Sequence, residues 1–207
     1  MRILIVLMLM FISNVACAEA LPAPLSHALH KLSQLSGFSC NFEQTLFYTD
    51  GSEQHYQGTL AVAKFGHFRW QYHKPYEQLY VSNGDGIWLY EPDLMQVQWL
   101  KSLDAVDPIV MRLLEGRVQE NEVHVLNVSK GVYHVRIGNQ ETAPELWLAL
   151  NAEGMPQWFE SRDSLDNRNR MWLIAIQQKK PKAKQFEFEV PDGVDVVDAN
   201  GMLMEKQ

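Results

Sequence analysis

The sequence has 207 residues, of which 46% are apolar and 21% are charged, and its formal net charge is −7. This composition is typical of one globular domain and excludes a disordered tail or a pair of large domains. The acidic balance argues against a protein that wraps nucleic acid, because such a protein presents a basic surface. Aromatic residues make up 11% of the chain, a large stock of bulky surface for a core or a cavity lining.

The first residues have the features of a secretory signal peptide. Arg2 precedes the continuous apolar run 3–12, and small residues follow at Ala16 and Ala18. This run is too short for a transmembrane helix, which needs about 20 apolar residues. We therefore expect residues 1–18 to be a cleaved signal peptide.

Cleavage after Ala18 would leave residues 19–207 as one exported domain whose sole cysteine is Cys40. Such a domain has no internal disulfide, so packing must hold it together. Because Cys40 alternates with phenylalanines, we expect it to be a small core residue. The alternative is a lipoprotein signal in which Cys17 carries the lipid, although Asn14 stands where that signal usually has leucine.

Two segments have the features of helices. Residues 25–35 carry leucines at helical spacing, with Ser26 as the predicted N-cap. Residues 107–116 form the second predicted helix, with Asp107 as N-cap and Gly116 at the exit.

Most of the remaining chain alternates apolar and polar residues, which predicts short strands from 38–42 to 186–190. The turns between them are rich in glycine, and 83–86 is a strong hairpin signal. We expect about ten to eleven strands in one meandering antiparallel sheet. A lysine-rich segment, 179–184, lies between two predicted strands and is either a solvated loop or a docking patch for an anionic surface.

Motifs for catalysis are absent from the sequence. There is no nucleophile elbow, no glycine-rich phosphate loop and no Cys-x-x-Cys pair. His27 and His30 can share a helix face, but no third ligand accompanies them, so we expect no metal and no cofactor. Glu160, Asp163 and Asp166 lie beside three arginines and predict a charged hairpin turn rather than a catalytic carboxylate pair. We expect no enzymatic activity.

Six segments, taken in chain order, share the pattern of one known family. They are residues 42–45, 58–75, 81–84, 87–92, 163–168 and 186–197. Together they resemble the periplasmic outer-membrane lipoprotein carrier family, the LolA-like chaperones, over nearly the whole exported chain. The resemblance implies an α+β, mainly β fold: an incomplete antiparallel β-barrel with a helical lid covering an apolar cavity.

The resemblance also implies a function and partners. It implies a periplasmic chaperone that takes acylated lipoproteins from an inner-membrane ABC transporter of the Lol type and delivers them to an outer-membrane lipoprotein receptor. The physical need is clear, because each methylene removed from water is worth about 0.8 kcal/mol and long acyl chains do not cross an aqueous compartment unaided. We expect a monomer with no nucleic-acid partner.

Bulky side chains supply the expected binding surface. We expect five rings to share one face of the sheet, and two residues of the second helix to form a movable lid above them. These predicted lipid-binding residues are Phe68, Trp70, Tyr72, Trp88, Tyr90, Met111 and Leu114. The alternative is that the same side chains form an ordinary packed core.

Lys64 departs from the pattern of the resembled family. There an arginine is common at this position and ties the closed lid to helix carbonyl groups, and proline is usual where this chain has Phe65. Since an ammonium lacks the planar fork of a guanidinium, its carbonyl bonding is weaker. We expect Lys64 to be the lid latch. The alternatives are a divergent paralogue that carries another lipid or serves as an envelope lipid-binding protein, and a hydrolase on a similar sheet.

Overall fold

The computed structural model describes residues 20–101 and 108–198. The predicted signal peptide, 1–18, lies outside the described residues, as do Cys17 and the predicted N-cap Asp107. Within the described part of the chain, no helix combines the length and the hydropathy needed to cross a bilayer.

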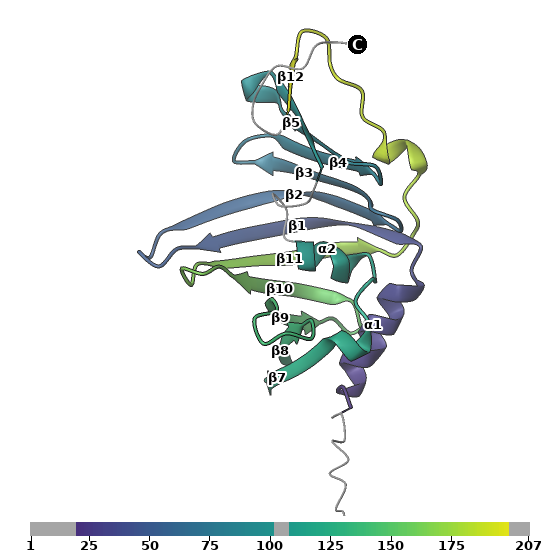
Figure 1. Cartoon of the computed structure of the whole chain (residues 1–207), viewed down its shortest axis with the longest axis vertical. Coiled ribbons are helices and arrows are strands. Elements are labelled where there is room, and N and C mark those ends of the chain that lie inside the picture. Colours follow the sequence, from purple (N-terminus) through teal and green to yellow (C-terminus); the bar gives the residue numbers. More distant parts are fainter. Residues whose placement is uncertain (1–19, 102–107, 199–207) are drawn as a thin grey trace, which may run out of the picture.

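One twelve-stranded sheet forms the body of the molecule (Figure 1). Its strands lie in the order β12-β6-β5-β4-β3-β2-β1-β11-β10-β9-β8-β7. Their bounds are β1 (Gly37–Phe47), β2 (Glu53–Ala63), β3 (His67–Lys74), β4 (Gln78–Asn83), β5 (Ile87–Glu91), β6 (Gln96–Leu100), β7 (Val123–Ser129), β8 (Val132–Ile137), β9 (Glu145–Leu150), β10 (Pro156–Arg162), β11 (Arg168–Gln177) and β12 (Asp195–Val197). The two edge strands, β12 and β7, do not pair, so the barrel is incomplete, which confirms the predicted fold class.

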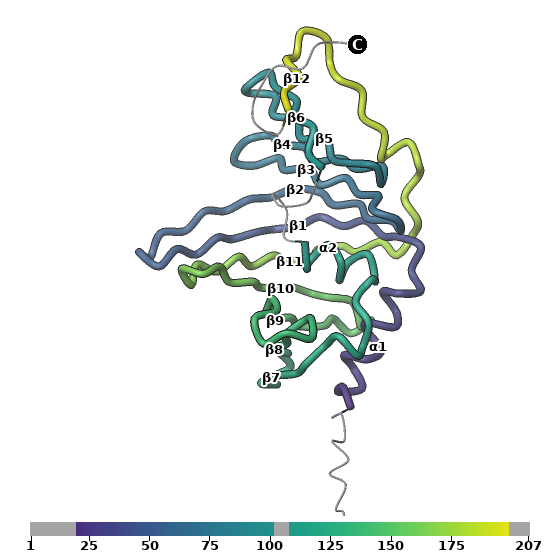
Figure 2. Tube along the Cα trace, viewed as in Figure 1, coloured from purple at the N-terminus to yellow at the C-terminus, as the bar shows by residue number. Residues whose placement is uncertain are grey.

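The Cα trace in Figure 2 shows the strands stacked from β12 at one end to β7 at the other, with both helices on the same side of the sheet. The helices are α1 (Ala23–Gln34) and α2 (Pro108–Leu114). The described residues also contain three single turns of 3₁₀ helix, η1 (Pro92–Leu94), η2 (Glu120–Glu122) and η3 (Ala183–Phe186).

The helix ends differ in part from the prediction. Ser26 is not the N-cap, because α1 begins at Ala23 with a proline in its first turn and Pro22 at the cap position. The Ser26 hydroxyl donates instead to Glu120 Oε1 at 2.6 Å. Gly116 does follow α2 as predicted, with φ +66°.

The predicted strand 186–190 is wrong. The chain makes the η3 turn there and then crosses the sheet without joining it, before β12 pairs with β6 in parallel. Phe186 is buried against Ala61 and Ala63, and Phe188 contacts the rings of β5. The alternation in this segment therefore reflects packing on a sheet face rather than strand hydrogen bonding.

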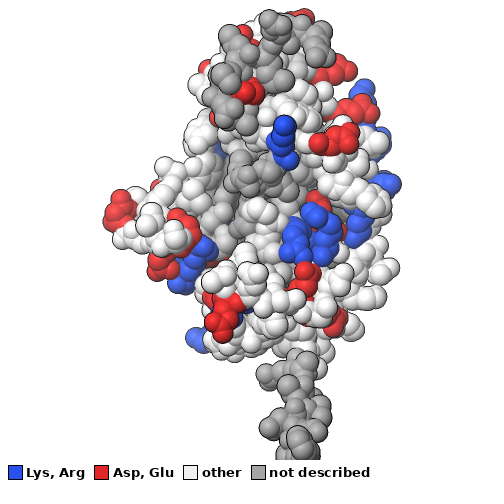
Figure 3. Space-filling view, viewed as in Figure 1, with Lys and Arg blue, Asp and Glu red and all other residues white. Residues whose placement is uncertain are grey.

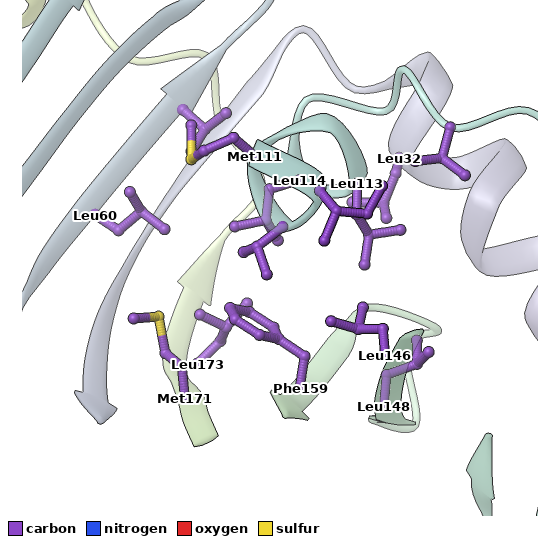
Figure 4. Close-up of a cluster of buried hydrophobic side chains, with 14 of the residues drawn as sticks. Leu32, Leu60, Met111, Leu113, Leu114, Leu146, Leu148, Phe159, Met171 and Leu173 are labelled. Atoms are coloured by element: carbon purple, nitrogen blue, oxygen red, sulfur yellow. The ribbon is translucent and has the colours of Figure 1, made fainter. Parts of the chain in front are cut away.

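The core lies between the concave face of the sheet and the two helices. Phe38 and Phe42 of β1 contribute to it, together with the leucines of α1 and nearly all of α2. Cys40 on the same face is 6% exposed and free, which confirms it as a core residue. Figure 4 shows α2 with its side chains against those of the strands.

Candidate functional site

An aromatic wall forms the part of the concave face that β3 contributes. Phe68 and Trp70 are buried and Tyr72 is partly buried, and all three point toward the helices, as predicted. The Phe42 ring packs edge-on against Trp70 at 5.7 Å and against Tyr72 at 5.1 Å. Burial raises the pKa of Tyr72, so its hydroxyl stays neutral.

One polar atom in this wall has no partner. Trp70 Nε1 is buried and makes no hydrogen bond with the described residues. A buried N–H group without an acceptor costs about 1–3 kcal/mol. The wall therefore holds an unused donor within an otherwise apolar interior.

Trp88 and Tyr90 do not belong to this wall, so the predicted single face of five rings is wrong. In the β4–β5 register Trp88 lies opposite Val81, while Tyr80, the partner of Trp70, lies opposite Leu89. The two rings therefore occupy the other face of the sheet. There Trp88 contacts Trp99 at 4.5 Å, and both Trp88 and Tyr90 contact Phe188 at 5.9 Å.

Helix α2 covers the wall and the neighbouring strands. Met111 and Leu114 are fully buried and point into the cluster that Leu60, Phe159 and Leu173 contribute from the strands (Figure 4). In this conformation the side chains of α2 occupy the space over the concave face. Another apolar group could occupy that space only if α2 moved away.

Lys64 lies where the two helices meet the sheet. It follows β2 directly, and its Nζ donates to Glu115 O at 2.8 Å and to Leu32 O at 3.3 Å. These acceptors belong to the ends of α2 and α1. One ammonium thus links the β2–β3 turn to both helices, and its burial lowers the pKa of Lys64.

Glu115 is a component of this junction that the sequence did not reveal. Its side chain is fully buried and pairs with Nε of Arg117. Burial raises the pKa of Glu115, while the charges of Arg117, Lys64 and His67 oppose the rise. Glu115 Oε1 has no hydrogen-bond partner among the described residues. No periodicity marks a carboxylate after a short helix as buried, so no sequence signal was available.

A polar pocket of about 550 Å³ lies at the far end of β1 from Lys64. It is lined by the apolar Leu46 and Ile109 and by polar residues of the β10–β11 hairpin, among them Asn169 and Arg168. Beneath it Gln44 Nε2 donates to Asn169 Oδ1 at 2.8 Å. Ile109 also belongs to the core cluster, so polar groups of the hairpin border the apolar interior at this end of β1.

The other sequence candidates are peripheral. Glu160 is buried beneath the β10–β11 hairpin and binds Arg170 at 2.7 Å, and Arg162 pairs with Asp166 at 3.0 Å, which confirms the charged hairpin. His27 and His30 are exposed on α1. Within residues 20–101 and 108–198, no group of three His, Cys, Asp or Glu side chains is arranged to hold a metal ion.

Comparison with known proteins gives a consistent result. The model of the family described as "Outer membrane lipoprotein carrier protein LolA" matches residues 33–189. Among curated relatives, the outer-membrane lipoprotein carrier protein of Chromobacterium violaceum is 29% identical, over 88% of this chain and 93% of its own length. The protein of the same name from Vibrio campbellii is 28% identical, over 81% and 82%.

Solved structures resemble the fold. An uncharacterized conserved protein from Thermus thermophilus superposes with a TM-score of 0.52 at 13% identity, covering 85% of this chain and 98% of its own. A LolA superfamily protein from Nitrosomonas europaea gives a TM-score of 0.46 at 11% identity, covering 79% and 98%.

Proposed function

Because this chain belongs to the LolA family of outer-membrane lipoprotein carriers, we propose that it shelters the acyl chains of lipoproteins between its concave sheet face and α2. The observation that carries the proposal is the junction at Lys64, where two hydrogen bonds hold both helices over an apolar wall. A net contribution of about 1 kcal/mol for each hydrogen bond makes such a latch strong enough to close and weak enough to open.

The physical cycle follows from the closed state. Opening exposes the buried side chains of α2, and the acyl chains of the cargo then cover the same apolar surface. Phe68, Trp70 and Tyr72 would form the floor of the loaded cavity, with Met111 and Leu114 as its movable cover. The unpaired Trp70 Nε1 offers a donor to an acyl carbonyl oxygen, which apolar side chains cannot replace.

The cargo named for the family suggests the cellular compartment and the partners of this protein. We place the protein in the periplasm, where a monomer would accept lipoproteins from an inner-membrane ABC transporter of the Lol type and pass them to an outer-membrane receptor. The predicted signal peptide, 1–18, supports this location. The polar pocket at the end of β1 suits the peptide segment that follows the acylated cysteine.

A second candidate, a carrier of another lipid, is favoured by one departure from the family pattern. Lys64 and Phe65 replace the arginine and proline that are common in the family. A latch with a single ammonium makes fewer carbonyl bonds, so the lid would open more readily for a smaller ligand.

The test is transfer of cargo into solution. Residues 19–207 are incubated with membrane vesicles that hold a lipoprotein and the energised transporter, and the soluble fraction is examined by native mass spectrometry. A soluble complex with a triacylated lipoprotein supports the first proposal, and a complex with a free lipid supports the second. Absence of both from the soluble fraction contradicts the carrier proposal.

A further inference from the structure

An exposed phenylalanine, Phe65, lies at the tip of the β2–β3 turn. Phe65 is 87% exposed, and its φ of +66° is followed by a φ of +76° at Gly66. Both φ values lie in the left-handed region, where Gly, Asn and Asp are favoured over bulky residues. A bulky residue pays a conformational cost there, and an exposed ring gains nothing from burial. The folded domain alone gives no reason for Phe65.

A basic segment lies beside this turn. Lys179, Lys180, Lys182 and Lys184 follow β11, all are exposed, and none forms an ion pair with another residue of the described chain. They occupy four of six successive positions in a chain whose net charge is −7.

Two contacts fix the lysine segment next to Phe65. The Phe186 ring packs against His67 at 5.6 Å, just after the turn. Within the segment, the buried Pro181 lies so close to Gly37, the partner of Ala63, that a Cβ at Gly37 would be 2.8 Å from its ring. Figure 1 shows this segment and the β2–β3 turn at the same edge of the molecule, and Figure 3 shows Lys and Arg side chains along that edge with Asp and Glu side chains among them.

Few opposing charges lie nearby. Exposed carboxylates near this surface include Asp85, which follows Gly84 where that glycine adjoins Phe65 O, and Glu187 and Glu189, which follow η3. Arg117 is half exposed, and its partner Glu115 is buried beneath it. The surface thus combines one apolar tip with excess positive charge.

We propose that this end of the molecule, formed by Phe65 and Lys179, Lys180, Lys182 and Lys184, docks on the surface of an anionic phospholipid bilayer. The Phe65 ring enters the interfacial layer, and the lysines lie over lipid phosphates. A convex tip suits a deformable bilayer, whereas a protein partner would need a preformed pocket for the ring. One ring and four lysines give reversible attachment, which a shuttling carrier requires.

Co-sedimentation with vesicles tests this proposal. Residues 19–207 are mixed with vesicles of phosphatidylglycerol and phosphatidylcholine, or of phosphatidylcholine alone. We expect binding to the anionic vesicles only, and loss of that binding at high salt. Replacing Lys180 and Lys182 with glutamine should weaken binding about thirtyfold, since each lysine near an anionic surface contributes about fivefold.

The Phe65→Asn variant keeps the test falsifiable, because asparagine suits the turn and should raise the melting temperature while weakening vesicle binding about tenfold. Leu165→Ala, at an exposed tip on the β10–β11 hairpin, and Lys130→Gln are matched controls that should bind as the parent does. Equal binding to neutral vesicles, no binding to anionic ones, equal losses in the controls, or binding only where a membrane protein is present would each overturn the proposal. Lipoprotein uptake is measured separately, by the appearance of the complex in the soluble fraction, so the two proposals fail independently.

Discussion

Lys64 joins the β2–β3 turn to both helices through a single ammonium. Its two hydrogen bonds reach Leu32 O and Glu115 O, and no other described side chain bonds to both helix ends. Lys64→Met keeps most of the apolar stem but removes both bonds, so we expect a loss of about 1–2 kcal/mol in unfolding free energy. We also expect faster hydrogen exchange in α2 and faster uptake of a fluorescent acyl probe. Lys64→Arg is the comparison variant, and it should slow uptake because a guanidinium offers the same carbonyls more N–H donors in a fixed planar fork.

The buried carboxylate of Glu115 gives the junction a pH dependence. Its pKa in the folded protein is raised, so the folded state holds a proton that the unfolded state releases. The resulting stability is present below the ordinary glutamate pKa and is lost as pH rises through the raised value. In Glu115→Gln the fall of the unfolding free energy with rising pH that Glu115 causes should disappear. An identical slope in the variant would show that other groups produce it.

Removing the indole N–H of Trp70 should change the affinity for an acyl ester more than it changes the unfolding free energy. Trp70→Phe removes a buried donor that has no partner in the closed state, so the unfolding free energy should change by less than about 1.5 kcal/mol. If the donor binds an acyl carbonyl, affinity for an acyl ester should fall about threefold to tenfold. Affinity for a hydrocarbon probe without a carbonyl should not fall, and equal losses for both probes would contradict the assignment.

At the scale of elements, the end of α2 approaches α1 so closely that a side chain is excluded. A Cβ at Gly116 would lie 2.2 Å from Leu32 O, and the φ there is +66°. Gly154 has a similar φ of +73°, but no atom lies within 4 Å of its hypothetical Cβ. Gly154→Ala should therefore cost about 1 kcal/mol from backbone strain alone. Gly116→Ala should cost at least about 2 kcal/mol more and loosen α2, as measured by denaturant unfolding and hydrogen exchange.

The strands show what could be predicted from sequence. Alternation identified nearly all of them. Phe68, Trp70 and Tyr72 share a face because they lie at alternate positions of one strand. The error at Trp88 and Tyr90 arose at a turn. Side chains of paired residues lie on the same face of the sheet. Between the paired Tyr72 and Gln78 there are five residues, so even-numbered side chains of β3 and β4 share the concave face. Between the paired Ser82 and Ile87 there are four, so on β5 the odd-numbered side chains lie on that face and Trp88 and Tyr90 lie on the other.

The junction shows why the rest could not be predicted. Lys64 was expected to contact helix carbonyls only because of the family resemblance, since no local pattern places a lysine against distant helices. Glu115 becomes buried because Gly116 brings α2 onto α1, which is a tertiary effect. The parallel β6–β12 pair likewise depends on a crossover that period-two alternation does not encode.

At the scale of the whole molecule, the sheet uses its two faces differently. The concave face packs against the helices, and the other face packs against the C-terminal segment, through Phe186 on β2 and β3 and Phe188 on β5. Phe188→Ala should therefore lower the unfolding free energy by about 1–2 kcal/mol while acyl-probe affinity stays unchanged. Phe68→Ala should lower both. A fall in probe affinity with Phe188→Ala would show that the faces are coupled.

The reactivity of Cys40 offers a way to measure how often the lid opens. It lies on the floor of the concave face and is the only cysteine of the predicted mature chain, and burial raises its pKa to about 12. Burial shields the thiol from reagents, and its raised pKa keeps it mostly protonated, so alkylation in the closed state is slow. Rapid modification must wait for an opening event. The alkylation rate at saturating reagent then counts how often the carrier opens, without any label having been engineered into it.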